Sequence, residues 1–309
     1  MSSPSTALTK PAKPKRPTRD EKIITASATI AQDAPQGDDL AFMHSIMCQV
    51  GLPRSRVDGS EFERKSGRGI LSVRAGRVFD GKELVLQPVP YGPMPRLMLA
   101  YLNTQAVRFN APEIAVGDSA AEFMRMIGIE NINGGRGGSY TTFRKQAQAL
   151  AACDLTLGYV APNGQPQTFY GRPIEHFAAW SKTESEQRAL WPGVMRFSES
   201  YFRTLKEHSV PLDIRAFMAL KGSALAMDIY AMFADRLHRI EGRPVVLHWA
   251  NAREQFGQEY KGKDPDKDFK REFLRALKDV LAVYPKARIK QVTGGLLMMS
   301  SPPPIPYKT

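Results

Sequence analysis

Cysteine is scarce in this chain of 309 residues, with only Cys48 and Cys153, far apart and outside any C-x-x-C pattern. Two such cysteines exclude a disulfide framework and a thiolate metal site, and they favour a reducing cytoplasm. Long apolar runs are missing too, because no stretch approaches the ~20 residues that a membrane-spanning helix needs. The basic N-terminus lacks the apolar segment of a secretory signal. We therefore expect a cytoplasmic protein.

The sequence also lacks the motifs of catalysis and cofactor binding. Neither of its two Gly-Lys pairs is followed by Ser or Thr, so no P-loop for nucleotide phosphates is present. The acidic run 264–268 begins like a calcium loop but continues with Phe269 where that loop needs glycine. Five histidines stand alone, outside any metal or hydrolase motif: His44, His176, His208, His238 and His248. We expect no catalytic residue, no metal and no cofactor, and hence a protein that is not an enzyme.

Charge of one sign prevails. The chain has 43 Lys and Arg against 31 Asp and Glu, which gives a net charge of +12 and a pI near 9.7. An excess of this size favours a polyanionic partner, either nucleic acid or an anionic membrane surface. Because neither a lipid anchor nor a long basic amphipathic membrane helix is present, we favour nucleic acid. A merely basic soluble protein is the alternative.

The N-terminal residues 1–38 are rich in proline, lysine and serine, which predicts a disordered basic arm. Such an arm can contact phosphates without sequence preference, although most such tails are only solvated leaders. Apolar residues at helical spacing predict a helix over 39–50. Two strand-like runs follow at 69–78 and 83–89, and the Asp80-Gly81 pair between them predicts a hairpin.

From residue 95 onward, one order of elements occurs twice: helix, strand, helix, turn, helix and hairpin. The first copy has predicted helices at 95–109, 119–127 (capped by Asp118) and 140–152, and strands at 113–116, 155–160 and 167–171. The second copy has predicted helices at 223–240, 250–260 and 269–284, and strands at 244–249, 287–292 and 295–299. This order is typical of a winged helix, in which a helix-turn-helix carries a β-hairpin.

The sequence therefore predicts an α+β fold with two tandem winged-helix domains, which share a pattern and few residues. We place the first domain, with its N-terminal helix and hairpin, at 39–181. A linker with junction helices occupies 182–222, and the second domain is 223–309.

The third helix of the first copy follows the glycine-rich turn GGRGGS at 134–139. At ~100° per residue, Phe143, Ala147 and Leu150 share one face, whereas the polar face has no acidic residue. Cations, an amide and short hydroxyls suit phosphates and base edges in a major groove, and glycines let backbone N–H groups approach a phosphate. The expected DNA contacts here are Arg136, Ser139 (also the expected N-cap), Thr141, Thr142, Arg144, Lys145 and Gln148. A plain amphipathic helix after a flexible loop is the alternative.

The third helix of the second copy has a basic face of its own. Phe269, Phe273 and Leu277 form its apolar stripe, and basic residues lie opposite and continue into the preceding turn. The expected DNA contacts here are Lys261, Lys263, Lys267, Lys270, Arg271, Arg275 and Lys278. A solvated charged face is the alternative.

Several runs resemble the RepA family of theta-type plasmid replication initiators, which use repeated origin sequences (iterons). They are GLPRS (51–55), PYGPMPRLMLAYLNTQAV (90–107), GGRGGSYTTFRKQ (134–146), VPLDIRAFMALKGSALAMDIYAMFADRL (210–237), QFG (255–257), FKREFLRALKDVLAVYP (269–285) and the final GGLLMMSSPPP. The resemblance extends from about residue 45 to the C-terminus.

This resemblance implies a bacterial, plasmid-associated protein that binds double-stranded origin DNA and promotes origin opening. It also implies recruitment of host replication proteins, such as the host initiator and the replicative helicase, and leaves a homodimer open. The alternatives are a plasmid-borne transcriptional repressor that uses the same modules, or a DNA nuclease or recombinase. Composition and spacing by themselves indicate only DNA binding, and the replication role comes from the resemblance.

Overall fold

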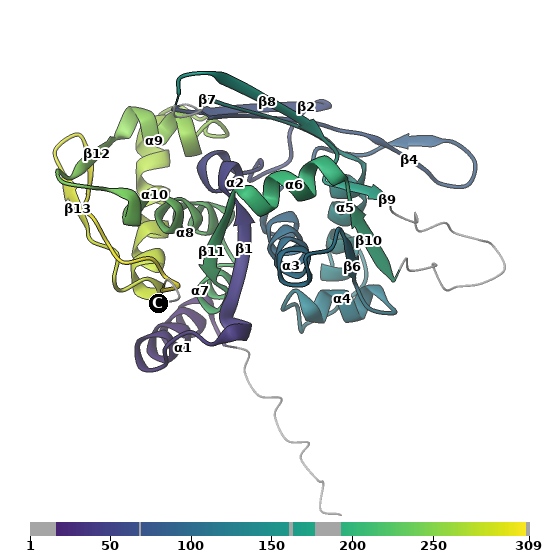
Figure 1. Cartoon of the computed structure of the whole chain (residues 1–309), viewed down its shortest axis with the longest axis horizontal. Coiled ribbons are helices and arrows are strands. Elements are labelled where there is room, and N and C mark those ends of the chain that lie inside the picture. Colours follow the sequence, from purple (N-terminus) through teal and green to yellow (C-terminus); the bar gives the residue numbers. More distant parts are fainter. Residues whose placement is uncertain (1–16, 68, 161–162, 177–192, 307–309) are drawn as a thin grey trace, which may run out of the picture.

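The computed structural model describes residues 17–306 except 68, 161–162 and 177–192. Helices and strands are mixed along the chain (Figure 1). In Figure 1, strands β1 (Leu40–His44) and β11 (Ser209–Asp213) lie between α8 (Ala224–Arg236) on one side and α3 (Pro93–Phe109) on the other. A single hydrophobic cluster includes buried residues from both sides, so the two sides share one core.

Helix α1 (Arg19–Gln32) lies within the segment that the sequence predicted to be disordered, and that prediction is wrong for these residues. Its first turn has a capping box, in which the Thr18 hydroxyl accepts from the Glu21 N–H (3.3 Å) and the Glu21 carboxylate accepts from the Thr18 N–H (2.6 Å). The helix packs on α10 (Pro265–Val283) through contacts that composition cannot show, because they depend on a distant segment. Residues 1–16 of the expected arm lie outside the described residues.

Residues 39–50 form a strand and a short helix where a single helix was expected. β1 is followed by α2 (Ser45–Val50), and β1 pairs antiparallel with β11, with Phe42 opposite Pro211 at the centre of the register. β11 is itself followed by a short helix, α7 (Ile214–Ala219). A strand followed by a short helix therefore occurs twice, and the two units meet across the β1–β11 pair. The helical spacing in 39–50 was misleading because the strand is specified by its distant partner.

The short helix α2 begins with a buried cap, His44. Its Nδ1 accepts a hydrogen bond from the Ile46 N–H (3.3 Å), so Nε2 carries the proton, and Nε2 has no hydrogen-bond partner. Burial, and then the nearby His208, lower the pKa of His44 from 6.5 to about 3. The imidazole is therefore neutral in the folded protein at neutral pH.

The free energy of unfolding should fall as the pH is lowered from 7 to 5, because His44 gains a proton only in the unfolded chain. Its folded-state pKa lies below the unfolded value, so its contribution is complete above pH 6.5 and is lost as the pH falls toward about 3. The loss between pH 7 and 5 should be about 2 kcal/mol. Urea unfolding across this range measures it. His44→Asn keeps an acceptor for the Ile46 N–H without titrating, and should reduce the pH dependence by this amount; an equal dependence in the variant would contradict the assignment.

A four-stranded antiparallel sheet of order β2-β3-β7-β8 lies along the top of Figure 1. Its strands are β2 (Glu61–Ser66), β3 (Gly69–Arg74), β7 (Asp154–Val160) and β8 (Pro166–Gly171). The hairpin expected at Asp80-Gly81 is confirmed as β4 (Arg77–Phe79) paired with β5 (Leu84–Leu86). Glycine is favoured at this turn because Gly81 has a φ of 103°. The predicted run 69–78 is thus divided between two sheets.

The elements predicted for the first copy are present in their predicted order. After α3 come β6 (Glu113–Ala115), α4 (Ala120–Met126) and α5 (Ser139–Ala152), and then β7 and β8. Ser119, not Asp118, caps α4, because its hydroxyl accepts from the Glu122 N–H. β6 pairs with β10 (Val194–Phe197), which also pairs with β9 (Ile174–His176). β10 therefore lies between β6 and β9, and β9 is the strand that follows the β7–β8 hairpin in the chain.

The elements predicted for the second copy are also present. α8 ends in the 3-10 turn Leu237–Arg239, and the chain continues with β12 (Val245–His248), α9 (Trp249–Phe256), α10, β13 (Ile289–Val292) and β14 (Gly295–Met298). The three strands form a sheet of order β12-β14-β13. Between the copies, the region expected as linker and junction helices contains α6 (Glu199–Glu207), β11 and α7. The charged run 182–187 lies outside the described residues.

Candidate nucleic-acid interface

The glycine-rich turn before α5 is a closed structure and not a loose loop. Gly135 and Gly137 have φ values of 87° and 80°, which favour glycine. A Cβ at Gly138 would lie 2.5 Å from the Asn133 carbonyl oxygen, so this close approach also requires glycine. Gly138 is the N-cap of α5, which corrects the assignment of Ser139. The Ser139 hydroxyl instead donates to the Asn131 carbonyl (2.8 Å) and so closes the turn.

The faces of α5 follow the expected pattern. Phe143, Ala147 and Leu150 are buried, as their spacing predicted. Gln146 is also buried, and its Oε1 accepts from the Tyr91 N–H (2.8 Å), a role that the sequence did not indicate. We call the predicted contacts on this side the α5 face: exposed Arg136, Thr141, Thr142 and Lys145, with partly exposed Ser139, Arg144 and Gln148. The Thr141 hydroxyl donates to the Gly135 carbonyl (2.8 Å), so it supports the turn as well.

The seven predicted contacts of the second copy are all exposed. We call them the α10 face: Lys261, Lys263, Lys267, Lys270, Arg271, Arg275 and Lys278. Asp264 caps the helix by accepting from the Lys267 N–H (3.2 Å). Acidic residues on the same helix pair with two of these cations, since Arg271 lies 2.9 Å from Asp268 and Arg275 lies 3.9 Å from Glu272. The face is therefore basic but less uniformly so than the α5 face.

The structure does not bring the α5 and α10 faces together into one cluster. In Figure 1, α10 lies on the side of α8 and α5 on the side of α3, with β1 and β11 between them. A ligand that contacts both faces must therefore extend across the molecule.

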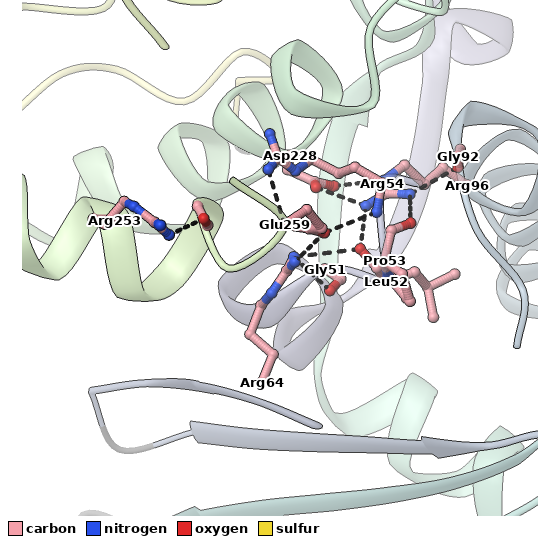
Figure 2. Close-up of polar contacts among 11 residues, drawn as sticks. Gly51, Leu52, Pro53, Arg54, Arg64, Gly92, Arg96, Asp228, Arg253 and Glu259 are labelled. Atoms are coloured by element: carbon pink, nitrogen blue, oxygen red, sulfur yellow. Dashed lines mark hydrogen bonds and ion pairs between the residues drawn. The ribbon is translucent and has the colours of Figure 1, made fainter. Parts of the chain in front are cut away.

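A buried ion pair joins the two sides (Figure 2). Arg96 of α3 donates from Nε to Asp228 Oδ1 (2.6 Å) and from Nη2 to Asp228 Oδ2 (2.7 Å), and Asp228 belongs to α8. The remaining Arg96 donors bond the carbonyls of Leu52 (2.6 Å), Gly92 (2.7 Å) and Pro53 (3.2 Å). Both charged side chains are almost fully buried. A pair with this two-pronged geometry fixes orientation as well as distance.

A second group of charges extends this junction. Glu259, in the turn between α9 and α10, accepts from Arg54 Nη2 (2.9 Å) and Arg64 Nη2 (2.5 Å). Burial opposes ionisation of Glu259, but the two guanidinium groups lower its pKa to about 2. Arg64 of β2 also donates to the Gly51 carbonyl (3.1 Å). Its guanidinium group therefore connects β2 to the segment after α2 and, through Glu259, to the second copy. The GLPR run, at 51–54, is the sequence signal for this junction, although its role could not be inferred from the sequence.

Among the described residues, no helix is both long and apolar enough to cross a membrane. Within the same residues, no group of three or more His, Cys, Asp or Glu side chains is placed to hold a metal ion.

Comparison with known proteins gives one family and one structural likeness. Residues 89–250, about half of the chain, match the family model described as plasmid encoded RepA protein. No curated protein matches the chain. A crystal structure of domains 2 and 3 of RctB, determined on selenomethionine derivatives, aligns with 81% of this chain and 93% of that chain, at 14% identity and a TM-score of 0.45.

Proposed function

The chain belongs to the plasmid encoded RepA protein family, and from this premise we propose that it is a plasmid replication initiator that binds origin DNA. The family match carries the proposal, and the matched residues include the glycine-rich turn and all of α5. The net charge of +12 supports a polyanionic partner. We further propose that the protein acts in the cytoplasm and performs no bond chemistry.

We propose that each copy is a winged-helix module. The element order and the β12-β14-β13 sheet support this for the second copy. For the first copy the support is the element order alone, since β6 pairs with β10 and the β7–β8 hairpin belongs to another sheet, with β2 and β3. On this proposal α5 and α10 are the helices that enter major grooves, and the α5 and α10 faces hold the DNA contacts. The domain limits 39–181 and 223–309 stay proposals. We also propose that β11 and α7, which lie in the region 182–222, belong with the second module as the counterparts of β1 and α2.

In the proposed mechanism, the protein acts on the origin through the free energy of its binding to DNA and not through a chemical reaction. Phosphate contacts from the basic residues supply affinity, and a few base contacts supply the register on the DNA. The Arg96–Asp228 pair supports a fixed spacing between α5 and α10, so both helices would meet successive grooves of one site. Several protein molecules bound to adjacent DNA repeats of the origin would strain a neighbouring A·T-rich segment toward opening. Recruitment of host replication proteins would follow.

Footprinting on the DNA that flanks the gene tests this function. Regularly spaced protected repeats are expected of an initiator, whereas a single protected palindrome over a promoter would identify a repressor. Incubation of supercoiled plasmid with the protein and magnesium should leave the plasmid unnicked. Nicked product would instead indicate a nuclease or recombinase.

Two substitutions on α5 should separate phosphate contacts from base contacts. Lys145→Ala should weaken binding to all sequences and lower the salt slope by about 1. Gln148→Ala should reduce discrimination by about 1–3 kcal/mol at one base pair and leave the salt slope unchanged. Fluorescence anisotropy on the specific site, on single-base variants and on random DNA measures both effects. Wild-type binding by both variants would remove the α5 face from the interface.

A further inference from the structure

A polar pocket of about 290 Å³ lies where α1, the start of α8 and α10 meet. Its lining includes Arg19 at the start of α1, Gly222 and Ser223 at the start of α8, and Arg275 of α10. Arg54, from the GLPR run, also lines it. The pocket therefore lies beside the α10 face and next to the charged junction, and neither of these accounts for it.

Unpaired donors gather at this pocket. Among the described residues, four buried side-chain nitrogen atoms have no hydrogen-bond partner, and two of them are the Nε atoms of Arg19 and Arg54. The Arg54 side chain is only 10% exposed. The other ends of both guanidinium groups are paired, Arg19 Nη2 with Asp279 (2.5 Å) and Arg54 Nη2 with Glu259 (2.9 Å). Both Nε atoms are shielded from solvent in this structure, so an acceptor in the pocket would reach them only after the guanidinium groups turn toward it, and it would then remove the cost of two unpaired donors.

The start of α8 adds donors and a favourable field. Ser223 is the N-cap and its hydroxyl accepts from the Ala226 N–H (3.2 Å). Ala224 and Leu225 also line the pocket, and N–H groups at such positions have no acceptor within the helix. The N-terminal end of a helix of this length carries a partial positive charge, which favours an anion.

The charges around the pocket favour an anion that accepts several hydrogen bonds. Its lining has three guanidinium groups and one carboxylate, Glu272, which pairs with Arg275 at 3.9 Å. Asp279 and Glu259 lie behind the arginines and orient them. Arginine donors together with helix N–H groups match the tetrahedral oxygens of a phosphate. A cation would face three arginine side chains, and Glu272 is the one carboxylate in the lining, so the lining suits an anion better than a cation.

We propose that this pocket binds a phosphate group, and that in function the phosphate belongs to the DNA backbone beside α10. The DNA source rests on the proposed function, whereas the phosphate chemistry does not. The pocket would hold the backbone from the α8 side while the α10 face contacts the groove, and so it would set the depth at which α10 enters.

Gly222 offers a sharp test. Its φ is not positive, and a Cβ there would meet only the Arg19 side chain, at 3.7 and 3.8 Å, which is ordinary contact. Gly222→Asp should place a carboxylate where the phosphate oxygens bind, beside the unpaired Arg19 Nε. Gly222→Ala is the matched control that adds the Cβ without the charge. Thermal melting of both variants verifies that they fold, and the aspartate variant should melt no lower than the control.

Two titrations are then compared at constant ionic strength. With inorganic phosphate alone, against chloride, the melting temperatures of the wild type and Gly222→Ala should rise, and that of Gly222→Asp should not. With the origin DNA, Gly222→Asp should bind about tenfold more weakly, with a salt slope lower by about 0.9, as expected for one lost phosphate contact. Gly222→Ala should bind DNA like the wild type.

The outcomes separate the two sources. A phosphate response lost in Gly222→Asp with DNA binding unchanged would assign the pocket to free phosphate and overturn the DNA assignment. If neither titration distinguishes Gly222→Asp from Gly222→Ala, the site itself is overturned. A wild-type protein that binds no DNA would refute the proposed function, while the titration with inorganic phosphate would still decide the site.

Discussion

Replacing Asp228 with alanine should lower the free energy of unfolding by about 3–5 kcal/mol, because it leaves the buried Arg96 without its counter-charge. Both side chains are nearly inaccessible to water, and their two hydrogen bonds are 2.6 and 2.7 Å long. Equilibrium unfolding in urea at pH 7 measures the loss. The exposed pair Arg172–Asp154 provides the control, and Asp154→Ala should cost at most about 1 kcal/mol.

A double substitution separates two contributions to the free energy of unfolding: the loss from leaving Arg96 buried without its counter-charge, and the net contribution of the ion pair itself. Arg96→Met combined with Asp228→Leu removes both charges and retains apolar volume, so it should recover most of the stability lost in Asp228→Ala. The double variant should nevertheless bind DNA less well, because the two-pronged ion pair orients α3 relative to α8 more closely than apolar contacts do. Equal stability losses in Asp228→Ala and Asp154→Ala would contradict this account of the junction.

Charge reversal on either of the two proposed recognition helices should by itself abolish tight binding to the origin site. Arg144→Glu with Lys145→Glu on α5, or Arg271→Glu with Arg275→Glu on α10, should each weaken binding by about 10²–10⁴-fold, the gain that linkage of two modules supplies. On the proposed function, one rigid molecule would engage two grooves at once, so each helix would depend on the other.

The control for these variants is Arg203→Glu with Lys206→Glu on α6, which reverses the same number of exposed charges on a helix that contributes to neither face. It should change binding far less, because neither residue belongs to the α5 face or the α10 face. All three proteins are titrated on one origin repeat at fixed salt. If charge reversal on one helix leaves the affinity for DNA at the wild-type value, that module is available for protein contacts, such as those of a homodimer. This result would refute the requirement that both helices contact DNA.

Local patterns predicted the parts of this fold that depend on neighbours in the sequence. The spacing of Phe143, Ala147 and Leu150 correctly identified the buried face of α5, and the Asp80-Gly81 pair correctly located a hairpin. Glycine spacing marked the turn before α5, although Gly138 and not Ser139 is its N-cap. Which of the residues on the α5 and α10 faces contact DNA stays a prediction.

The parts that were missed depend on distant contacts. α1 has one buried residue, Ile23, and is held by α10, so its composition resembles that of a disordered tail. β1 has the spacing of a helix and becomes a strand because β11 pairs with it. The junction of Arg96 with Asp228 unites residues from α3 and α8, and neither residue belongs to a local motif.

The β1–β11 pair also determines when this protein can finish folding during its synthesis. Phe42 and its partner Pro211 are 169 residues apart. At ~5–20 residues per second, the ribosome needs roughly 10–30 s to make the second strand after the first. During that interval Ala41 and Met43, which are buried in the finished protein, have no strand to pair with. The N-terminal half therefore completes its core only after the chain has been made past Asp213.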